Sequence, residues 1–531
     1  MSSITKQTVG NNTYLYESHS FRDDLGRPRN SKVKIGKIDR ATGRAIYTQE
    51  YIDRMREAGT PLAIPETDRI DGLEQRISEA LDSLKSYGMF YFLRKTAEKI
   101  KLIKVLEQTL PQYWEELCMI SFYLISSDKP LMYMEDWITE NESYPVGRMS
   151  SQRLSELLGA FGQKERNDFY RAWCAVNLSD EYLALDITSI SSHSQFISEC
   201  EPGYNREGDA LSQINLCLLC GEKTHLPVYQ TIYSGNLVDV STFRTTIKEM
   251  EAISGGKKLI LVTDKGFYST ENVKLMVQEY SSSEFLMAVP FSNLWAKEQV
   301  IKERDTIDRP ENLILTSGSP CRGVSRKIVL DGFQLIAHIR YNPERALAER
   351  NELYTHVVWL KQMVQSGKKM HSFSKEIKKY LLVSKTGKVI HAQINGKEVE
   401  RSLLTSGWFI LLGNGEITAQ QAHDIYQKKD VAEKAFMKYK SMLSLRRLRV
   451  HSDERMKNKL LVGFLALTLI SYIHKIMKEK NLYRKMTMEK MFITLSKLKK
   501  VAINGHHILR PSTKEQQDIF SAFSIPRPFV G

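Results

Sequence analysis

The stretch 181–190 reads EYLALDITSI and places one aspartate, Asp186, among leucine, alanine and isoleucine residues. Apolar residues recur along this run in the pattern of a β-strand that belongs to the protein core. An ionised carboxylate is almost never left unpaired in such a strand, because removing it from water costs on the order of several kcal/mol. We therefore expect Asp186 to face a cation.

The residues that follow predict an α/β domain built around this strand. Apolar runs separated by turn-rich borders indicate an alternation of strands and helices. In chain order these are strands at 212–220 and 226–235, a helix at 241–253, a strand at 257–267, a helix at 269–280 and a strand at 284–290. Strand, strand, strand, helix, strand, helix, strand is the element order of a ribonuclease H-like core.

A second aspartate, Asp264, ends the apolar part of the run KKLILVTDKGF. Open α/β sheets bind their ligands at the carboxyl ends of strands, which favours a functional role for this side chain. The alternative is a helix cap or a turn, because DKG is a turn-like sequence.

A Lys-rich helix is predicted at 426–440, YQKKDVAEKAFMKYK, within a helix that begins at the capping box TAQQ, 418–421. Glu433 lies seven residues after Tyr426 and seven before Lys440, which brings all three to nearly one face of a continuous helix. The alternative is an amphipathic helix with a solvated charged edge.

Asp186, Asp264 and Glu433 together would offer three hard oxygen ligands, which suit Mg²⁺ or Mn²⁺. Paired ions of this kind activate a water molecule and stabilise the leaving oxygen in phosphodiester cleavage. The three carboxylates therefore indicate a metal-dependent site.

This set of residues resembles the DDE transposases of bacterial insertion sequences. In one branch, the third acidic residue lies in a helix signature of tyrosine, two residues, arginine, three residues, glutamate, six residues and lysine. Tyr426, Lys429, Glu433 and Lys440 have these spacings. Lys429 replaces the signature arginine, so a point charge stands in place of a planar, bidentate fork.

The resemblance extends over most of the chain. Asp186 in LALDITS and Asp264 in VTDKGF match the first and second aspartates of the family. The segment 227–243, with its GN, D and ST residues, is similar to the family's segment between them. The separation of 169 residues between Asp264 and Glu433 resembles the β-rich insertion that this branch carries before its final catalytic helix.

The resemblance implies a transposase that binds the ends of its element, cleaves by metal-dependent hydrolysis and transfers the 3′-hydroxyl ends to target DNA. Asp186, Asp264 and Glu433 would hold two Mg²⁺ or Mn²⁺ ions. A dimer on DNA and a bacterial cytoplasmic location at the nucleoid are also implied. The residues expected to contact DNA phosphates are Tyr426, Lys429, Lys440, Arg446, Arg447 and Arg449.

Two other functions remain open at this point. One is a two-metal DNA nuclease or resolvase without strand transfer, and the long insertion and the amino-terminal ribbon argue against it. The other is a non-catalytic, DNA-binding transposase remnant, against which the intact set of three carboxylates argues.

Composition agrees with a polyanionic partner. The 531 residues include 76 lysines and arginines against 62 aspartates and glutamates, a net charge of +14. Nucleic acid is the commonest partner of such a chain. The start, MSSITKQTVGNN, has no apolar stretch that would serve as a signal peptide.

Two sequence features are assigned to the core. The most apolar run, 460–473, has 14 residues, fewer than the about 20 that a membrane span needs, so we expect a buried helix and no membrane role. Cys217 and Cys220 form a lone CxxC that we interpret as buried strand; a zinc site completed by His193, Cys200 or His225 is the less favoured alternative.

Six segments are expected along the chain. They are a basic β-ribbon at 1–60, a helical region at 61–178, the first part of the core at 179–290, the insertion at 291–405, the rest of the core at 406–480 and a helical tail at 481–531. The ribbon owes its charge to Arg22, Arg27, Arg29, Lys32, Lys34, Lys37, Arg40 and Arg44. These cations either contact DNA phosphates or form a solvated surface, and the sequence favours neither interpretation over the other.

Three tryptophans lie in or beside the insertion, Trp295, Trp359 and Trp408. Relatives that cut through a DNA hairpin use an aromatic side chain to hold a flipped base. Each of these tryptophans is more readily explained as core, and the sequence does not choose among them.

Overall fold

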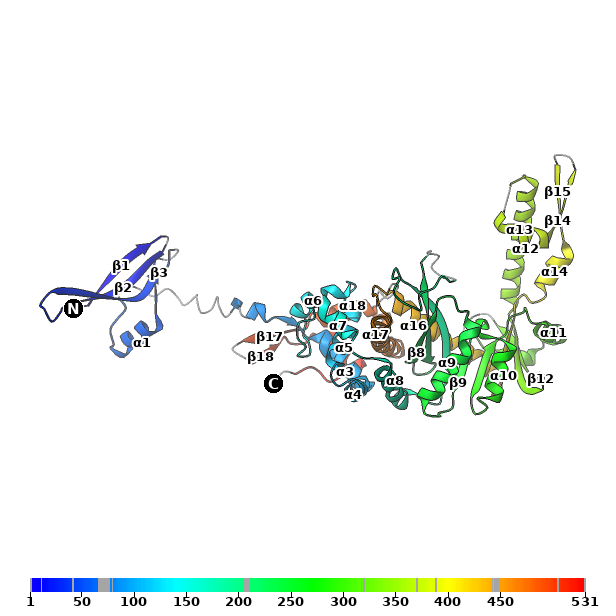
Figure 1. Ribbon diagram of the computed structural model, residues 1–531, viewed down its shortest axis with the longest axis horizontal. Coiled ribbons are helices and arrows are strands. Elements are labelled where there is room, and N and C mark those ends of the chain that lie inside the picture. The colour runs from blue at the N-terminus through cyan, green and yellow to red at the C-terminus, as the bar shows by residue number, and fades with distance from the viewer. Residues whose placement is uncertain are drawn as a thin grey trace. The chain divides into compact units, whose positions relative to one another are not determined.

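The computed structural model describes residues 2–10, 12–40, 43–64, 77–78, 80–203, 211–316, 318, 320–368, 371–386, 389–441, 443, 448–503 and 506–529 (Figure 1). The chain divides into two compact units. The amino-terminal unit comprises Met1–Ser86, Leu498–Pro511 and Pro528–Gly531, and the main unit comprises Tyr87–Lys497 and Ser512–Arg527.

The amino-terminal unit contains the predicted basic ribbon. Strands β2 (Asn12–Arg22) and β3 (Pro28–Ile38) pair antiparallel, and β4 (Ala45–Tyr47) extends the sheet on the β3 side before helix α1 (Gln49–Glu57). The sheet has a further strand at the start of the predicted ribbon, β1 (Ser2–Val9), which pairs with β2. Its residues SSITKQTV hold too few apolar side chains to indicate a strand by themselves.

A small apolar core fixes this sheet against α1. Its buried residues are Leu15, Ile35, Ala45, Tyr47, Tyr51 and Ile52. The amino-terminal half of β3 contributes no side chain to this core. Its residues are exposed, and Arg29, Lys32 and Lys34 are among them. These cations are therefore accessible to an anionic partner.

The sequence predicted a helical tail at 481–531, but the structure contains strands there as well as helices. Helices α18 (Met488–Ser496) and α19 (Lys514–Ala522) flank a hairpin of β17 (Lys499–Ile503) and β18 (His506–Leu509). Strand β17 also pairs with β5 (Lys85–Ser86), so the hairpin finds its third strand more than 400 residues away. A pairing at such a distance leaves no local signal in the sequence.

The main unit is built on one nine-stranded sheet with the order β11-β12-β13-β16-β10-β9-β6-β7-β8. Strands β6 (Leu183–Ser191), β7 (Gln213–Gly221) and β8 (Pro227–Ser234) form an antiparallel meander. Strands β9 (Ile260–Thr263) and β10 (Glu284–Ala288) continue the sheet in parallel with β6. The element order predicted for 181–290 is confirmed, and the chain is of mixed α/β class.

Helices α9 (Asp239–Ser254) and α10 (Thr270–Gln278) make the connections that return the chain to parallel strands (Figure 1). The region before β6 is helical, as expected. It contains α3 (Gly88–Lys99), α4 (Leu102–Thr109), α5 (Trp114–Ser126), α6 (Met134–Glu140), α7 (Ser151–Leu157) and α8 (Gln163–Asn177).

The segment at 291–405 is mixed rather than β-rich. After α11 (Leu294–Glu303), strands β11 (Leu313–Ile314), β12 (Cys321–Leu330) and β13 (Phe333–Tyr341) extend the main sheet by way of β16 (Trp408–Gly413). The next residues form a separate small core with α12 (Pro343–Gln365), α13 (Ser374–Tyr380), α14 (Gly396–Leu403) and the hairpin of β14 (Leu381–Thr386) and β15 (Val389–Ile394). The start of α12 at Asn342 and Pro343 is as predicted.

After β16, the last strand of the nine-stranded sheet in chain order, come α15 (Ala419–Lys428), α16 (Asp430–Ser441) and α17 (Asp453–Glu479). By length and composition α17 could cross a membrane, but most of its apolar window is buried inside the structure. It packs against α3, α5, α16 and β8. The prediction of a buried core helix at 460–473 is therefore confirmed.

We predict that Phe464→Ala in α17 lowers the free energy of unfolding of the main unit by about 3–5 kcal/mol, because it empties a fully buried site. Phe464 is 0% exposed and meets Phe169 and Tyr170 edge to face. Urea unfolding followed by circular dichroism measures the change. The exposed Ile493→Ala serves as the control, and an equal loss in both variants would contradict the assignment of α17 to the core.

Candidate active site

The sheet brings Asp186 and Asp264 to the same level on neighbouring strands. In the parallel pair β6 and β9, Leu183 lies opposite Leu261 and Leu185 lies opposite Thr263. The next residue on each strand is an aspartate, Asp186 on one and Asp264 on the other. Because parallel strands keep their register, Asp186 within β6 lies level with Asp264, which directly follows the carboxyl end of β9.

The two aspartates differ in their surroundings. Asp186 is only 6% exposed, and its Oδ1 accepts the N–H of Ile187 at 2.9 Å. Asp264 is half-buried, and its Oδ1 accepts the N–H of Lys265 at 2.8 Å and the hydroxyl of Tyr426 at 3.1 Å. Asp264 thus caps the short turn that follows β9, as the alternative interpretation proposed, and also contacts the helix signature.

Helix α15 positions Tyr426 against the sheet. The capping box is present as predicted, with Gln421 N–H donating to Thr418 Oγ1 at 3.2 Å and Thr418 N–H donating to Gln421 Oε1 at 2.9 Å. Tyr426 then packs its ring against Phe409 of β16, with 5.0 Å between the ring centroids. Its hydroxyl is left at the end of β9, where it meets Asp264.

The sequence predicted one continuous helix through 426–440, but the structure has two helices here. The break lies at Lys429, where Lys429 N–H donates to Tyr426 O at 3.1 Å and Ala432 N–H donates to Lys429 O at 3.1 Å. These bonds span three residues instead of four and tighten the turn. The seven-residue spacing therefore places Glu433 and Lys440 on one face of α16, while Tyr426 belongs to the preceding helix.

Lys429 is the buried cation of the site. Its side chain is 5% exposed, its Nζ lies 3.1 Å from Glu433 Oε1, and it stands 5.9 Å from the centroid of the Tyr426 ring. Glu433 is the exposed member of the pair, with 59% of its side chain accessible. The ion pair is therefore anchored on the lysine, and the carboxylate remains within reach of solvent.

The hydroxyl of Tyr426 is held in its protonated form. Burial is the largest cause that raises the pKa of this phenol, and the charges of Asp264 and Glu433 raise it further. A protonated phenol donates a hydrogen bond, and Tyr426 donates its own to Asp264 Oδ1.

The three carboxylates come from elements that pack together, since α16 lies against β6 and β7. Within the described part of the chain, no three His, Cys, Asp or Glu side chains gather closely enough to hold one ion. The donors that Asp186, Asp264 and Glu433 offer are all carboxylate oxygens, which is the chemistry that Mg²⁺ and Mn²⁺ prefer. The chemistry of this donor set therefore suits a hard divalent ion, while the described structure pairs Glu433 with Lys429 and does not gather the three carboxylates around one point.

The other predicted DNA contacts lie downstream. Lys440 is partly exposed in the last turn of α16, and Arg449 is exposed and lines a cavity with His451 and Arg455. Arg446 and Arg447 fall outside the described residues.

One cation near the site was missed. Arg340 of β13 contacts His423 Nδ1 at 2.5 Å and lies 5.1 Å from the centroid of the Phe409 ring, beside Tyr426. Burial lowers the pKa of this guanidinium. The sequence signal that could have identified it is an arginine inside the apolar strand FQLIAHIRY. A charged side chain in such a strand is rarely buried without a partner, as argued for Asp186.

The CxxC cysteines and the three tryptophans singled out in the sequence all contact other protein side chains or lie in the core. Cys217 and Cys220 are fully buried in β7, as expected, and burial raises the pKa of both thiols. Trp408 is 6% exposed and packs on Tyr341, Trp295 donates its indole N–H to the Tyr268 hydroxyl at 2.9 Å, and Trp359 packs on Phe373.

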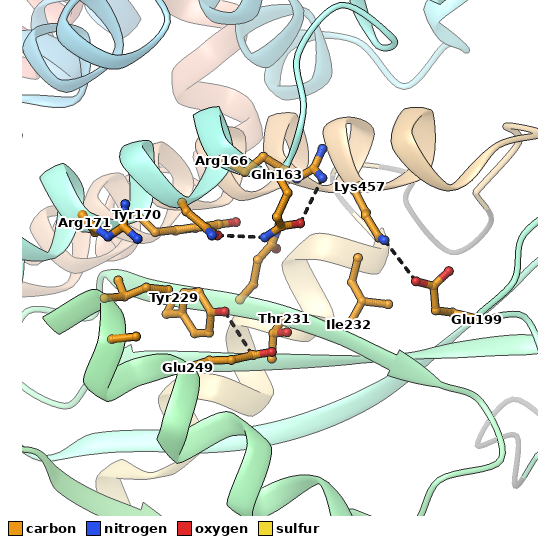
Figure 2. A pocket seen from close by; sticks show the side chains of 14 residues that line it. Gln163, Arg166, Tyr170, Arg171, Glu199, Tyr229, Thr231, Ile232, Glu249 and Lys457 are labelled. Atoms are coloured by element: carbon orange, nitrogen blue, oxygen red, sulfur yellow. Dashed lines mark hydrogen bonds and ion pairs between the residues drawn. The ribbon is translucent and has the colours of Figure 1, made fainter.

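A hollow of about 330 Å³ lies elsewhere in the main unit, between α8, β8, α9 and α17 (Figure 2). Its charged groups are paired with one another or with close neighbours. Lys457 pairs with Glu199 at 3.1 Å, and Tyr229 donates to Glu249 at 3.1 Å. Arg166 on its wall pairs with Glu454 at 2.7 Å, so this hollow offers no charge to a ligand.

The transposase DDE domain family matches the chain over residues 178–469. The chain has no match among curated proteins. Among solved structures it is similar to piggyBac transposase in a synaptic complex with hairpin DNA, at 12% identity and a TM-score of 0.36, over 78% of this chain and 76% of that one. A likeness of that strength carries no argument. The family match spans more than half of the chain and includes Asp186, Asp264 and Glu433, and the chain therefore belongs to the transposase DDE domain family.

Proposed function

We propose that this transposase cleaves DNA at the ends of its element by metal-dependent hydrolysis and joins the freed 3′-hydroxyl ends to target DNA. The observation that carries the proposal is the register of β6 and β9, in which Asp186 and Asp264 are the next residues on adjacent strands. The family match supports the reaction class. A nuclease without strand transfer would use the same carboxylates and remains the second candidate.

We infer a ribonuclease H-like core for the main sheet. Support comes from the order β8-β7-β6-β9-β10, in which three antiparallel strands are followed by two parallel ones. We further propose that residues 1–60 contact DNA through the exposed cations of β3, and that 291–405 is an insertion into this core.

Asp186, Asp264 and Glu433 would hold two Mg²⁺ or Mn²⁺ ions. When bound, such ions supply Lewis-acid activation of water and stabilisation of the leaving oxygen. Tyr426 would hold Asp264 in place through its hydroxyl. Lys429 would neutralise Glu433 before substrate arrives and then meet a phosphate oxygen, since its short reach from Glu433 keeps it beside the scissile bond.

Partners of the reaction follow from the same proposal. The net charge of +14 favours DNA, and Lys440 and Arg449 lie downstream of Glu433 where a bound strand would pass. Both element ends must be joined in one event, so the active form on DNA would be a dimer.

The first test removes each metal ligand while keeping its size. Asp186→Asn, Asp264→Asn and Glu433→Gln should each lower cleavage of a labelled duplex carrying the element end by at least ~10³-fold, because the carboxylate charge is lost. Gel-shift affinity for the same duplex in Ca²⁺ should stay unchanged. The exposed Asp424→Asn of α15 is the matched control. A variant that cuts at the wild-type rate in Mg²⁺ would remove its residue from the site.

The second test addresses the hydroxyl that Tyr426 donates to Asp264. Tyr426→Phe should lower the cleavage rate or the Mg²⁺ affinity by about 10–100-fold, as loss of an outer hydrogen bond to a metal ligand does. The Mg²⁺ concentration that gives half the maximal rate measures the effect. DNA affinity should not change, and an unaltered Mg²⁺ dependence would show that the hydroxyl has no role in positioning Asp264.

The third test separates phosphate contact from metal binding on α16. Lys440 lies two turns beyond Glu433, at about 10 Å, too far to share its ion but placed for a neighbouring phosphate. Lys440→Ala should reduce the slope of log affinity against log salt by about one unit, and Glu433→Gln should leave it unchanged. Binding isotherms at several salt concentrations measure the slopes, with exposed Lys302→Ala as control. Equal slopes for wild type and Lys440→Ala would assign this lysine to a solvated face.

A further inference from the structure

A second face of α16 borders a cationic cavity of about 250 Å³. Lys434 and Lys438 lie one and five residues after Glu433, so they point about 100° and about 140° around the helix axis from it. The rest of the wall comes from the turn after β7, from α15 and from α17. Among the described residues that line it are four lysines and two histidines, against a single acidic residue, Asp430.

Half of the lysine charge is neutralised within the protein. Lys434 forms an ion pair with Asp430, and Lys428 forms one with Glu222. Lys438 and Lys478 have no ion pair or hydrogen bond from their side chains to any residue that the structure describes. The cavity therefore carries uncompensated positive charge.

Lys438 is the inner of these two unpaired lysines. Burial lowers the pKa of its ammonium to about 8, and the nearby charge of Lys434 contributes to the shift. Lys478 lies at the exposed rim, near the end of α17. A half-buried cation without a counter-ion costs free energy unless an anion from outside pairs with it.

Uncharged hydrogen-bonding groups complete the wall. His474 Nδ1 lies 2.6 Å from the Tyr483 hydroxyl, and burial together with the surrounding lysines lowers the pKa of this imidazole to about 4, so the ring is neutral at pH 7. Ser471 is 2% exposed and lines the cavity with its hydroxyl-bearing side chain. These groups can donate to oxygen atoms of a bound anion.

We propose that this cavity binds a phosphate group, through the ammonium groups of Lys438 and Lys478 and the hydroxyl of Ser471. Its volume is below the range of about 300–1,000 Å³ typical of pockets for drug-sized ligands, which favours a small group. A phosphate of the DNA backbone and free inorganic phosphate share this chemistry. The site goes beyond the proposed catalytic function, because none of these residues belongs to the three-carboxylate site.

The experiment compares wild type with Lys438→Gln, Lys478→Gln and the exposed Lys104→Gln of α4, which removes one charge outside the cavity. Thermal unfolding is measured in inorganic phosphate and in sodium chloride of equal ionic strength. Phosphate should raise the Tm of wild type and of Lys104→Gln beyond the chloride effect. For the two cavity variants the phosphate affinity from calorimetry should fall at least tenfold. Lys478→Gln changes an exposed side chain, so a loss of folding cannot explain its result.

A DNA arm distinguishes the two sources of phosphate. If the ligand is the DNA backbone, Lys438→Gln and Lys478→Gln each reduce the salt slope of duplex binding by about one unit, and Lys104→Gln does not. If the ligand is free phosphate, the slopes stay equal while the phosphate effect on Tm is lost. The proposal is overturned if phosphate acts no differently from chloride and the three variants share one salt slope. Cleavage by the wild-type protein is scored separately, so this result does not bear on the proposed catalysis.

Discussion

The site depends on the register of two parallel strands, which sets Asp186 of β6 level with Asp264, the residue directly after β9. The register of β6 and β9 leaves Asp186 and Asp264 no freedom to separate along the sheet. Both accept a backbone N–H from the residue that follows them in the chain. Tyr426 supplies a hydroxyl to Asp264, and Lys429 brings a buried ammonium to Glu433 on the facing helix. The hydrogen bond from Tyr426 to Asp264 thus ties α15 to the end of β9, and α16 is held against β6 and β7 by packing.

The sequence alone predicted those parts of the site whose structure is determined by residues within one helix or strand. The strand around Asp186, the capping box before α15 and the burial of Cys217 were all predictable, because each follows from the residues within one element. The break at Lys429 was not, since the residues around it form helix well on either side. Arg340 was missed because its partners, His423 and Phe409, are 69 or more residues away in the chain.

Pairing between residues that are distant in the chain also determines the structure of the segment between β10 and β16. Its strand β13 pairs with β16, and β16 also pairs with β10, so the chain leaves the sheet and returns beside the strand it left. Helices α12 to α14 build a core of their own. The family resemblance implied an insertion here, but only pairing across the sheet separates the strands that extend the main sheet from the part that does not. Such a part can vary in length without moving α15.

The burial of α17 has a consequence for how the protein is made. Helix α5 ends at Ser126 and packs against α17, which begins at Asp453, 327 residues later. At about 5–20 residues per second, synthesis of the intervening chain takes roughly 16–65 s. Throughout that time α5, whose nine buried residues include Leu117, Phe122 and Leu124, lacks its partner on the ribosome. Until α17 is made, this apolar face of the nascent chain is exposed to the solvent or to other chains, and a chain that ends before α17 lacks the helix against which α5 packs.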